Sequence, residues 1–399
     1  MSTVTDTTIT TTGGAATAAD DADRFVALAR EVGVRAAATA ARHDRDGTFV
    51  TEAYDAMREL GYLRLAVPSD LGGMGASMRQ VLRAQAELAR HDGATALAVA
   101  MHLYNTLVLC ARRRAGAADA EVGLRKIATD GMVVTTSGGS DWLWPTTVAV
   151  EADGGYRVSG RKTFTSQAPV GDVMTTSAVV GEPVPGAEVI HFTLPMHVDG
   201  VEIVETWDTL GMRGTASHDV VITDVFIPAD RVVDRRPWGE LGRGLHAAAA
   251  HFAPVVSAVY WGIAAGARDH AVDHLATKRR GTTAATSSEP VQRQVGLMDA
   301  RLRVAWWSLE GALDELGEPL QPGPQALALL MLAKRECVLA AREVVDLAME
   351  VTGGGSFYRS SPLERAYRDV RAGTYHPLTP EAALAYAGRL ALGGDVTRA

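Results

Sequence analysis

The chain has 399 residues, of which 47% are hydrophobic and 22% charged, and its formal net charge at pH 7 is −8. This composition is typical of a globular protein, and the length allows two or three domains around a substantial core. Because no block of basic residues is present, neither a nucleic acid nor an anionic membrane surface is expected as a partner.

Residues 1–21 lack the basic start and the apolar centre of a signal peptide, so we expect them to form a disordered tail. No apolar run reaches the length expected of a transmembrane helix. The two cysteines, Cys110 and Cys337, are far apart and have no CxxC or His-rich companion, which argues against a disulfide framework or a metal site. A reducing cytoplasm fits these features best.

The first predicted domain covers residues 22–130. Apolar residues recur there every three or four positions, and alanine and leucine are abundant, which is typical of amphipathic helices. A stretch rich in glycine and proline at residues 66–77 interrupts this pattern and predicts a loop. We therefore expect an N-terminal helical domain.

Residues 131–236 follow a different pattern, in which apolar and polar residues alternate and β-branched residues are frequent. The sequence Asp153-Gly154-Gly155 is a strong signal for a tight hairpin. The pattern predicts an antiparallel β domain in the middle of the chain.

Helical periodicity returns in residues 237–399 and predicts a C-terminal helical bundle. The long helices are expected from Gly242 to Arg280, from Pro290 to Leu316 and from Gln325 to Thr352. The predicted fold class is mainly α with a central β domain.

No P-loop, GxGxxG, HExxH or GxSxG motif is present, but three longer segments are informative. ELGYLRLAVPSDLGGMGAS (59–77), WDTLGMRGTASHDVVITDVFIPADRVV (207–233) and VTGGGSFYRSSPLERAYRDVRAG (351–373) resemble, in this order, three motifs of the acyl-CoA dehydrogenase superfamily. The resemblance implies an acyl-CoA dehydrogenase-like fold, with a helical domain, a β-barrel or sandwich domain and a four-helix bundle. It also implies a homotetramer or dimer that holds a flavin, by family habit FAD, between the β domain and the bundle.

The resemblance further implies which residues contact the flavin ring. The family places an aromatic side chain and a hydroxyl at the strand end that is here Phe164-Thr165-Ser166, where Ser166 would donate to the ring and Phe164 would cover a face. In the shortened loop TTSGGSDW, residues 135–142, hydroxyl and amide donors to the flavin are expected from Thr135, Thr136 and Ser140.

Two other motifs are expected at the flavin diphosphate. One is the pair Gly353-Gly354, which belongs to a triple glycine after a long helix. Because glycine has no side chain, the backbone there can approach a pyrophosphate closely. Arg279 and Arg280 stand where the family sends an arginine across the subunit interface, although cations are also common at helix C-termini.

A dehydrogenase of this fold needs a carboxylate to remove the substrate α proton. The register of the usual glutamate falls here on Tyr375-His376-Pro377-Leu378, and the long helix where some members carry it instead has no acid between His251 and Tyr260. The usual base is therefore missing.

A second branch of the family, the two-component monooxygenases, takes reduced flavin from a separate reductase and oxygenates an aromatic ring or an amine. The order Arg368-Asp369, then His376, looks like that branch, so His376 and Ser166 are the candidate catalytic residues. Trp142, Trp144, His251, Tyr260 and Trp261 are expected to line a pocket for an aromatic or heteroaromatic small molecule.

Two alternatives stay open. In the first, the chain is a dehydrogenase of CoA or carrier-protein thioesters with a relocated base, such as Glu381 or His251. In the second, it is a catalytically silent protein that serves as a structural or binding partner.

Overall fold

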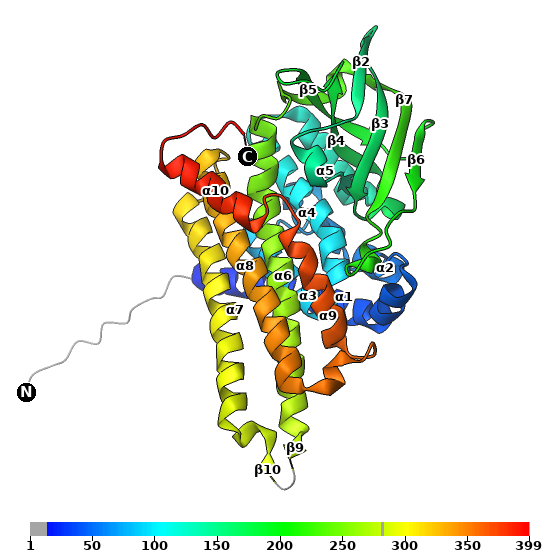
Figure 1. Ribbon diagram of the computed structural model, residues 1–399. Coiled ribbons are helices and arrows are strands. Elements are labelled where there is room, and N and C mark those ends of the chain that lie inside the picture. Colours follow the sequence, from blue (N-terminus) through cyan, green and yellow to red (C-terminus); the bar gives the residue numbers. More distant parts are fainter. Residues whose placement is uncertain (1–13, 281–282, 399) are drawn as a thin grey trace, which may run out of the picture.

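The computed structural model describes residues 14–280 and 283–398 (Figure 1). Of the tail expected at residues 1–21, residues 1–13 lie outside the described part, whereas residues 14–21 form the start of helix α1 (Gly14–Asp46). A helical domain is followed by a sheet domain and then by a second helical domain, which confirms the predicted fold class.

From residue 14 onward, the N-terminal domain contains five α-helices, and the local sequence explains where two of them begin. Helix α3 begins with a capping box, in which Ser77 and Gln80 each bond the other's backbone, and the Asp92 side chain accepts from the backbone N–H of Thr95 to cap α4. After α1 come α2 (Thr51–Leu60), α3 (Met78–His91), α4 (Gly93–Arg114) and α5 (Ala118–Asp130).

The middle domain is one sheet of eight strands. They are β1 (Val134–Thr136), β2 (Val148–Ala152), β3 (Gly155–Thr165), β4 (Val173–Val180), β5 (Glu188–Pro195), β6 (Val201–Val204), β7 (His218–Pro228) and β8 (Val232–Pro237). The strand order is β6-β7-β3-β2-β4-β5-β8, and β1 pairs with β4. The hairpin at Asp153-Gly154-Gly155 joins β2 to β3. The sheet is not wholly antiparallel as expected, because β4 runs parallel to both β1 and β2.

The C-terminal domain is a bundle built around α6 (Arg243–Thr277), which lies between the N-terminal helices and α8. The other helices are α7 (Glu289–Leu316), α8 (Pro324–Thr352), α9 (Pro362–Asp369) and α10 (Pro380–Ala391). The first long helix was expected to reach Arg280, but it ends at Thr277. Arg279–Arg280 instead form β9, which pairs with β10 (Thr283–Ala284) in a short hairpin.

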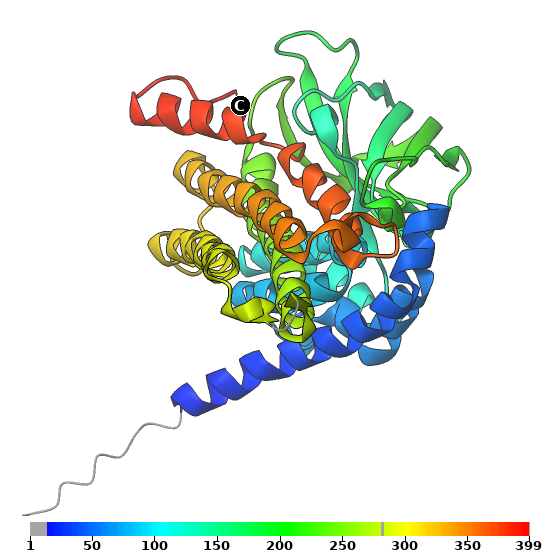
Figure 2. The ribbon, with the colours of Figure 1, turned by 60° about the horizontal axis from the view of Figure 1, so that its bottom comes forward.

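One large apolar core joins both helical domains, while the sheet has a separate core of its own. In both views the β domain sits at one end of the helical body (Figures 1 and 2). Contrary to expectation, α4 and α6 are long and apolar enough to cross a membrane. Their most apolar windows are 83% and 78% buried inside the protein, as is usual for core helices.

Candidate active site

A cavity of about 860 Å³ lies where the β domain, α4, the first turns of α6 and the segment after α9 meet. This volume is in the range of cofactor and substrate sites in proteins. Aromatic side chains supply much of its lining, from Tyr104, Trp142, Phe164, Phe192, Trp207, Phe252 and Tyr375.

The end of β3 places Phe164 at this cavity through a local break in the strand. Lys162 faces the sheet interior, and a register shift between Lys162 and Thr165 then turns Thr165 inward. Phe164, with φ of 56°, is left 52% exposed at the cavity, with its ring edge-to-face on Trp207. Phe164 therefore lines the cavity, whereas Thr165, also expected at the flavin, is buried and does not line it.

Ser166 also lines the cavity, and its Oγ lies 2.7 Å from Ser217 Oγ. Of the hydroxyls expected in the neighbouring loop, only that of Thr136 is on a cavity-lining residue. Thr135 is fully buried and donates to the Ser166 carbonyl at 2.6 Å, so it supports the site from behind. Ser140 is exposed outside the cavity.

A buried ion pair, not foreseen from the sequence, fixes the loop after β1. Lys162 is fully buried and donates to Asp141 Oδ2 at 2.8 Å and to the Ser177 carbonyl at 2.5 Å. Burial lowers the pKa of Lys162, and the Asp141 carboxylate opposes this effect. A lysine at an inward-facing position of a predicted strand is the sequence signal that would have revealed the pair.

The two tryptophans of this loop do not face the same side. Residues 139–142 form a 3-10 turn and not the extended segment that was expected. Trp142 lines the cavity, whereas Trp144 packs against Trp238, with ring centroids 5.9 Å apart.

On the opposite wall, His376 lines the cavity and its Nε2 lies 2.7 Å from the hydroxyl of Tyr260. Tyr260 is itself fully buried, so it acts behind the cavity. Lys334, fully enclosed on α8, donates to the carbonyls of His376 at 3.0 Å and Leu378 at 2.8 Å. Burial, together with the positive charge of Lys334, lowers the pKa of His376 to about 3. The imidazole is therefore neutral at physiological pH.

Two other residues expected in the pocket face elsewhere. Trp261 follows Tyr260 on α6, and successive helical positions point about 100° apart. Its indole packs on Trp306 and donates to the Leu302 carbonyl at 2.8 Å. His251 is 2% exposed, and its Nδ1 lies 2.7 Å from the Ala247 carbonyl.

Within the described residues, the acids that line the cavity are Asp141 and Asp234. Asp141 pairs with Lys162, and Asp234 Oδ2 accepts from the backbone N–H of Gly244 at 2.9 Å. Glu381 is exposed at the start of α10 and lies outside the cavity. Neither Glu381 nor His251 is therefore placed to replace the missing base.

The residues expected at the flavin diphosphate lie at the far end of the bundle. Lys278 Nζ donates to the Thr352 carbonyl at 2.6 Å, which brings the end of α6 close to Gly353-Gly354 and to Arg279–Arg280. This end of α6 is remote from Arg243, the cavity-lining end of the same helix (Figure 1). The chain therefore does not bring these four residues to its own cavity.

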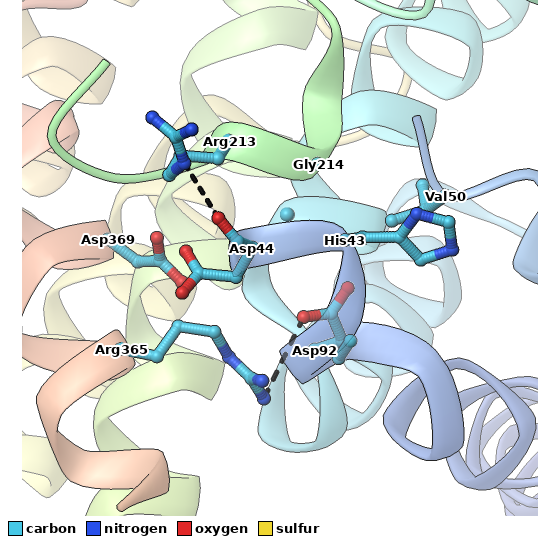
Figure 3. A pocket seen from close by; sticks show the side chains of 10 residues that line it. His43, Asp44, Val50, Asp92, Arg213, Gly214, Arg365 and Asp369 are labelled. Atoms are coloured by element: carbon cyan, nitrogen blue, oxygen red, sulfur yellow. Dashed lines mark hydrogen bonds and ion pairs between the residues drawn. The ribbon is translucent and has the colours of Figure 1, made fainter. Parts of the chain in front are cut away.

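A polar cluster beside the cavity holds the three domains together (Figure 3). Arg213, in the loop before β7, donates to the Asp44 carbonyl at 2.7 Å. Asp369, at the end of α9, accepts from the backbone N–H of Met212 at 2.5 Å and is 2% exposed. Burial raises the pKa of Asp369 to about 7, although the bond from Met212 opposes this shift.

Family profiles match the chain in three consecutive parts. The profiles described as the N-terminal, middle and C-terminal domains of acyl-CoA dehydrogenase match residues 19–117, 132–225 and 254–381.

Known proteins are similar over most of the chain. YdbM of Bacillus subtilis (strain 168), whose name places it among the acyl-CoA dehydrogenases, is 32% identical over 364 residues, covering 87% of this chain and 91% of YdbM. The amino sugar nitrososynthase DnmZ of Streptomyces peucetius is 33% identical over 369 residues, covering 88% of each chain. The structure of KijD3 in complex with FMN and dTDP-3-amino-2,3,6-trideoxy-4-keto-3-methyl-D-glucose has a TM-score of 0.84 and 30% identity, covering 96% of this chain and 95% of KijD3.

Proposed function

Because this chain belongs to the acyl-CoA dehydrogenase family, and is accordingly a flavin-dependent oxidoreductase, we propose that it works as a monooxygenase that uses reduced flavin and O2. The observation that carries the proposal is the composition of the cavity wall. Where a dehydrogenase would present a carboxylate base, this chain presents His376, held by Tyr260. The two described acids at the cavity are already engaged, Asp141 with Lys162 and Asp234 with the backbone N–H of Gly244 on α6.

The residues at the cavity fit a flavin ring. Phe164 is an exposed aromatic face, and Ser166 and Thr136 offer hydroxyls beside it. The volume of about 860 Å³ leaves space for a ring system and a small substrate together.

We propose FAD as the flavin, supplied in reduced form by a separate flavin reductase. Gly353-Gly354 and Arg279–Arg280 are far from the cavity of their own chain, and FMN has no second phosphate for them to bind. In a homo-oligomer, each chain would present these residues to the diphosphate of FAD in a neighbouring subunit. The KijD3 structure contains FMN, so the choice between the two flavins rests on this distal motif.

When reduced flavin is bound, it supplies two electrons to O2, so that one oxygen atom enters the substrate and the other leaves as water. The protein must position the substrate and keep water out. The aromatic walls exclude water, and Phe252 packs edge-on against the His376 ring, with centroids 5.9 Å apart. His376 offers a hydrogen bond at the cavity wall without adding a charge.

For the substrate, we propose an aromatic or heteroaromatic small molecule that stacks on Trp142 and Phe252. A second candidate is the amine of a molecule that also carries an anionic group. The similarity to DnmZ and KijD3 favours it, and so does Arg243, which lines the cavity and has no ion-pair partner among the described residues.

The test is to mix the protein and reduced flavin anaerobically with isotopically labelled O2 and a panel of aromatic compounds and amines. Incorporation of one labelled oxygen atom into a product would support the proposal. Oxidation of acyl-CoA with an artificial electron acceptor, and no incorporation from any compound of the panel, would instead support the dehydrogenase alternative. Failure to bind any flavin would support the catalytically silent alternative.

A further inference from the structure

The hydroxyl of Tyr260 has a single described partner. It lies fully buried on α6, and its only hydrogen bond among the described residues joins it to His376 Nε2 at 2.7 Å. Burial, with Asp369 on α9 contributing, raises the pKa of Tyr260 well above its ordinary value. The phenol therefore keeps its proton.

The direction of this hydrogen bond follows from counting donors. If Nε2 carried the histidine proton, it would donate to the Tyr260 oxygen, and the phenol proton would be buried without an acceptor. Leaving a buried donor unsatisfied is unfavourable. If Tyr260 donates instead, both atoms are satisfied and the single proton of the neutral imidazole must lie on Nδ1. Nδ1 bonds to no described residue, and His376 lines the cavity.

Lys334 fixes the backbone of the same segment. It reaches across from α8, and its Nζ bonds to the carbonyls of His376 and Leu378, with no ion pair to any acid of the described residues. Burial lowers the pKa of Lys334 to about 7. Because a neutral amine still has two hydrogens, one for each carbonyl, the anchor persists on both sides of that pKa.

We propose that Tyr260 and Lys334 are positioning residues for His376: Lys334 fixes its backbone, and Tyr260 holds its neutral imidazole with the proton on Nδ1, so that the ring donates a hydrogen bond to the cavity and cannot serve as a base. Its catalytic consequence rests on the proposed function. Neither ring nitrogen is free to accept a proton from the substrate, because Nε2 accepts from Tyr260 and Nδ1 already carries a proton. The charged group that most affects His376 is Lys334, which disfavours a second ring proton.

The direct test is nitrogen NMR of the full chain labelled in its histidines, since protonated and unprotonated ring nitrogens resonate far apart. His376→Ala lacks the signals of this residue and so identifies them among the 11 histidines. We expect a proton on Nδ1 and none on Nε2, unchanged between pH 6 and 8. A proton on Nε2 in the unmodified protein would overturn the proposal. This readout needs no turnover, so it stands apart from the proposed function.

Two variants extend the test to the positioning residues. Tyr260→Phe removes the donor to Nε2, so we expect a mixture of the two imidazole tautomers. Lys334→Met should leave the tautomer unchanged but lower the fraction of reduced flavin that yields product. Flavin affinity should be unchanged in both variants. An unaltered tautomer in Tyr260→Phe would exclude Tyr260 from this role, and unaltered product yield in Lys334→Met would exclude Lys334.

Discussion

At the scale of single residues, the site depends on which hydrogen bonds each side chain already makes within the protein and which remain free for a ligand. Ser166 and His376 both line the cavity, and each is hydrogen-bonded to another polar side chain. Ser166 bonds to Ser217, which also lines the cavity, and His376 bonds to Tyr260, which is buried behind it. Held side chains lose little entropy when a ligand binds, which favours precise positioning. The cavity is therefore largely formed before a ligand enters.

His376→Ala tests the donor directly. We expect folding and flavin affinity to be nearly unchanged, while formation of oxygenated product falls on the order of 10²-fold, as when one preorganised donor is removed. Reduced flavin would then yield hydrogen peroxide in place of product. The measurement is the ratio of product to peroxide per reduced flavin consumed. His197→Ala, on an exposed residue of the β domain, is the control, and an equal loss in both variants would contradict a specific role for His376.

Asp369 predicts a pH-dependent stability. Its folded pKa of about 7 is higher than the unfolded value of about 3.9. The folded state therefore binds more protons between these values, and the contribution of Asp369 to stability falls as pH rises from 4 to 7. Asn at this position can still accept from Met212 and does not titrate.

The measurement is the free energy of unfolding of the unmodified chain and of Asp369→Asn across this pH range. The unmodified chain should lose stability relative to the variant as pH rises. A constant difference between the two proteins would show that Asp369 titrates as an ordinary surface carboxylate does.

At the scale of elements, periodicity predicted most of the helices and the sheet. Helices α7 and α8 begin within one residue of the expected positions, because Pro290 and Pro324 lie in their first turns, where proline is tolerated. Two predictions were wrong where the backbone leaves a regular helix or strand. Helix α6 ends at Thr277, before the two arginines, and a 3-10 turn that ends at Trp142 replaces the extended segment that was expected to carry Trp142 and Trp144.

The site was predictable from sequence only in part, for a related reason. Motif resemblance indicated Phe164, Ser166 and His376, which all line the cavity. It did not indicate Lys334 or the pair of Lys162 with Asp141, because the partners lie far apart in the sequence and meet only through packing. The strand pattern gives a signal only for Lys162, at an inward-facing position of β3; for Lys334, on helix α8, nothing in the sequence distinguishes a buried lysine from an exposed one.

Gly354→Trp tests the distal glycine motif. A Cβ added at Gly354 meets no atom of residues 14–280 or 283–398 within 4 Å and needs no unusual backbone angle, so the fold should tolerate the change. We expect affinity for FAD to fall and affinity for FMN to stay the same, measured by titration of the apoprotein. Gly388→Trp, also in open space on α10, is the control. Equal loss for both flavins, or for neither, would remove this loop from the site.

At the scale of the whole molecule, a single long helix connects two distant regions. The 35 residues of α6 span about 52 Å at 1.5 Å per residue, from Arg243 at the cavity to the tip that precedes Arg279–Arg280. Because α6 packs against the N-terminal helices and α8 along one continuous core, this distance is rigid. The tip therefore cannot fold back onto the cavity of its own chain.

Dilution provides a test at this scale. If the tip completes the FAD site of a neighbour, FAD affinity should weaken when the protein is diluted until the oligomer dissociates, because assembly and binding are linked. FMN affinity should depend much less on protein concentration. Analytical ultracentrifugation and flavin fluorescence, recorded on the same dilution series, would show both effects. FAD affinity that persists in a fully dissociated chain would exclude a contribution from the neighbour.

The length of α6 also has a genetic consequence. A chain damaged at the cavity, for example in His376→Ala, keeps an intact tip, and a chain damaged at Gly354 keeps an intact cavity. In a mixed assembly, the intact cavity of the second chain can face the intact tip of the first. Two defective alleles expressed together would then complement each other and restore part of the activity that each lacks alone.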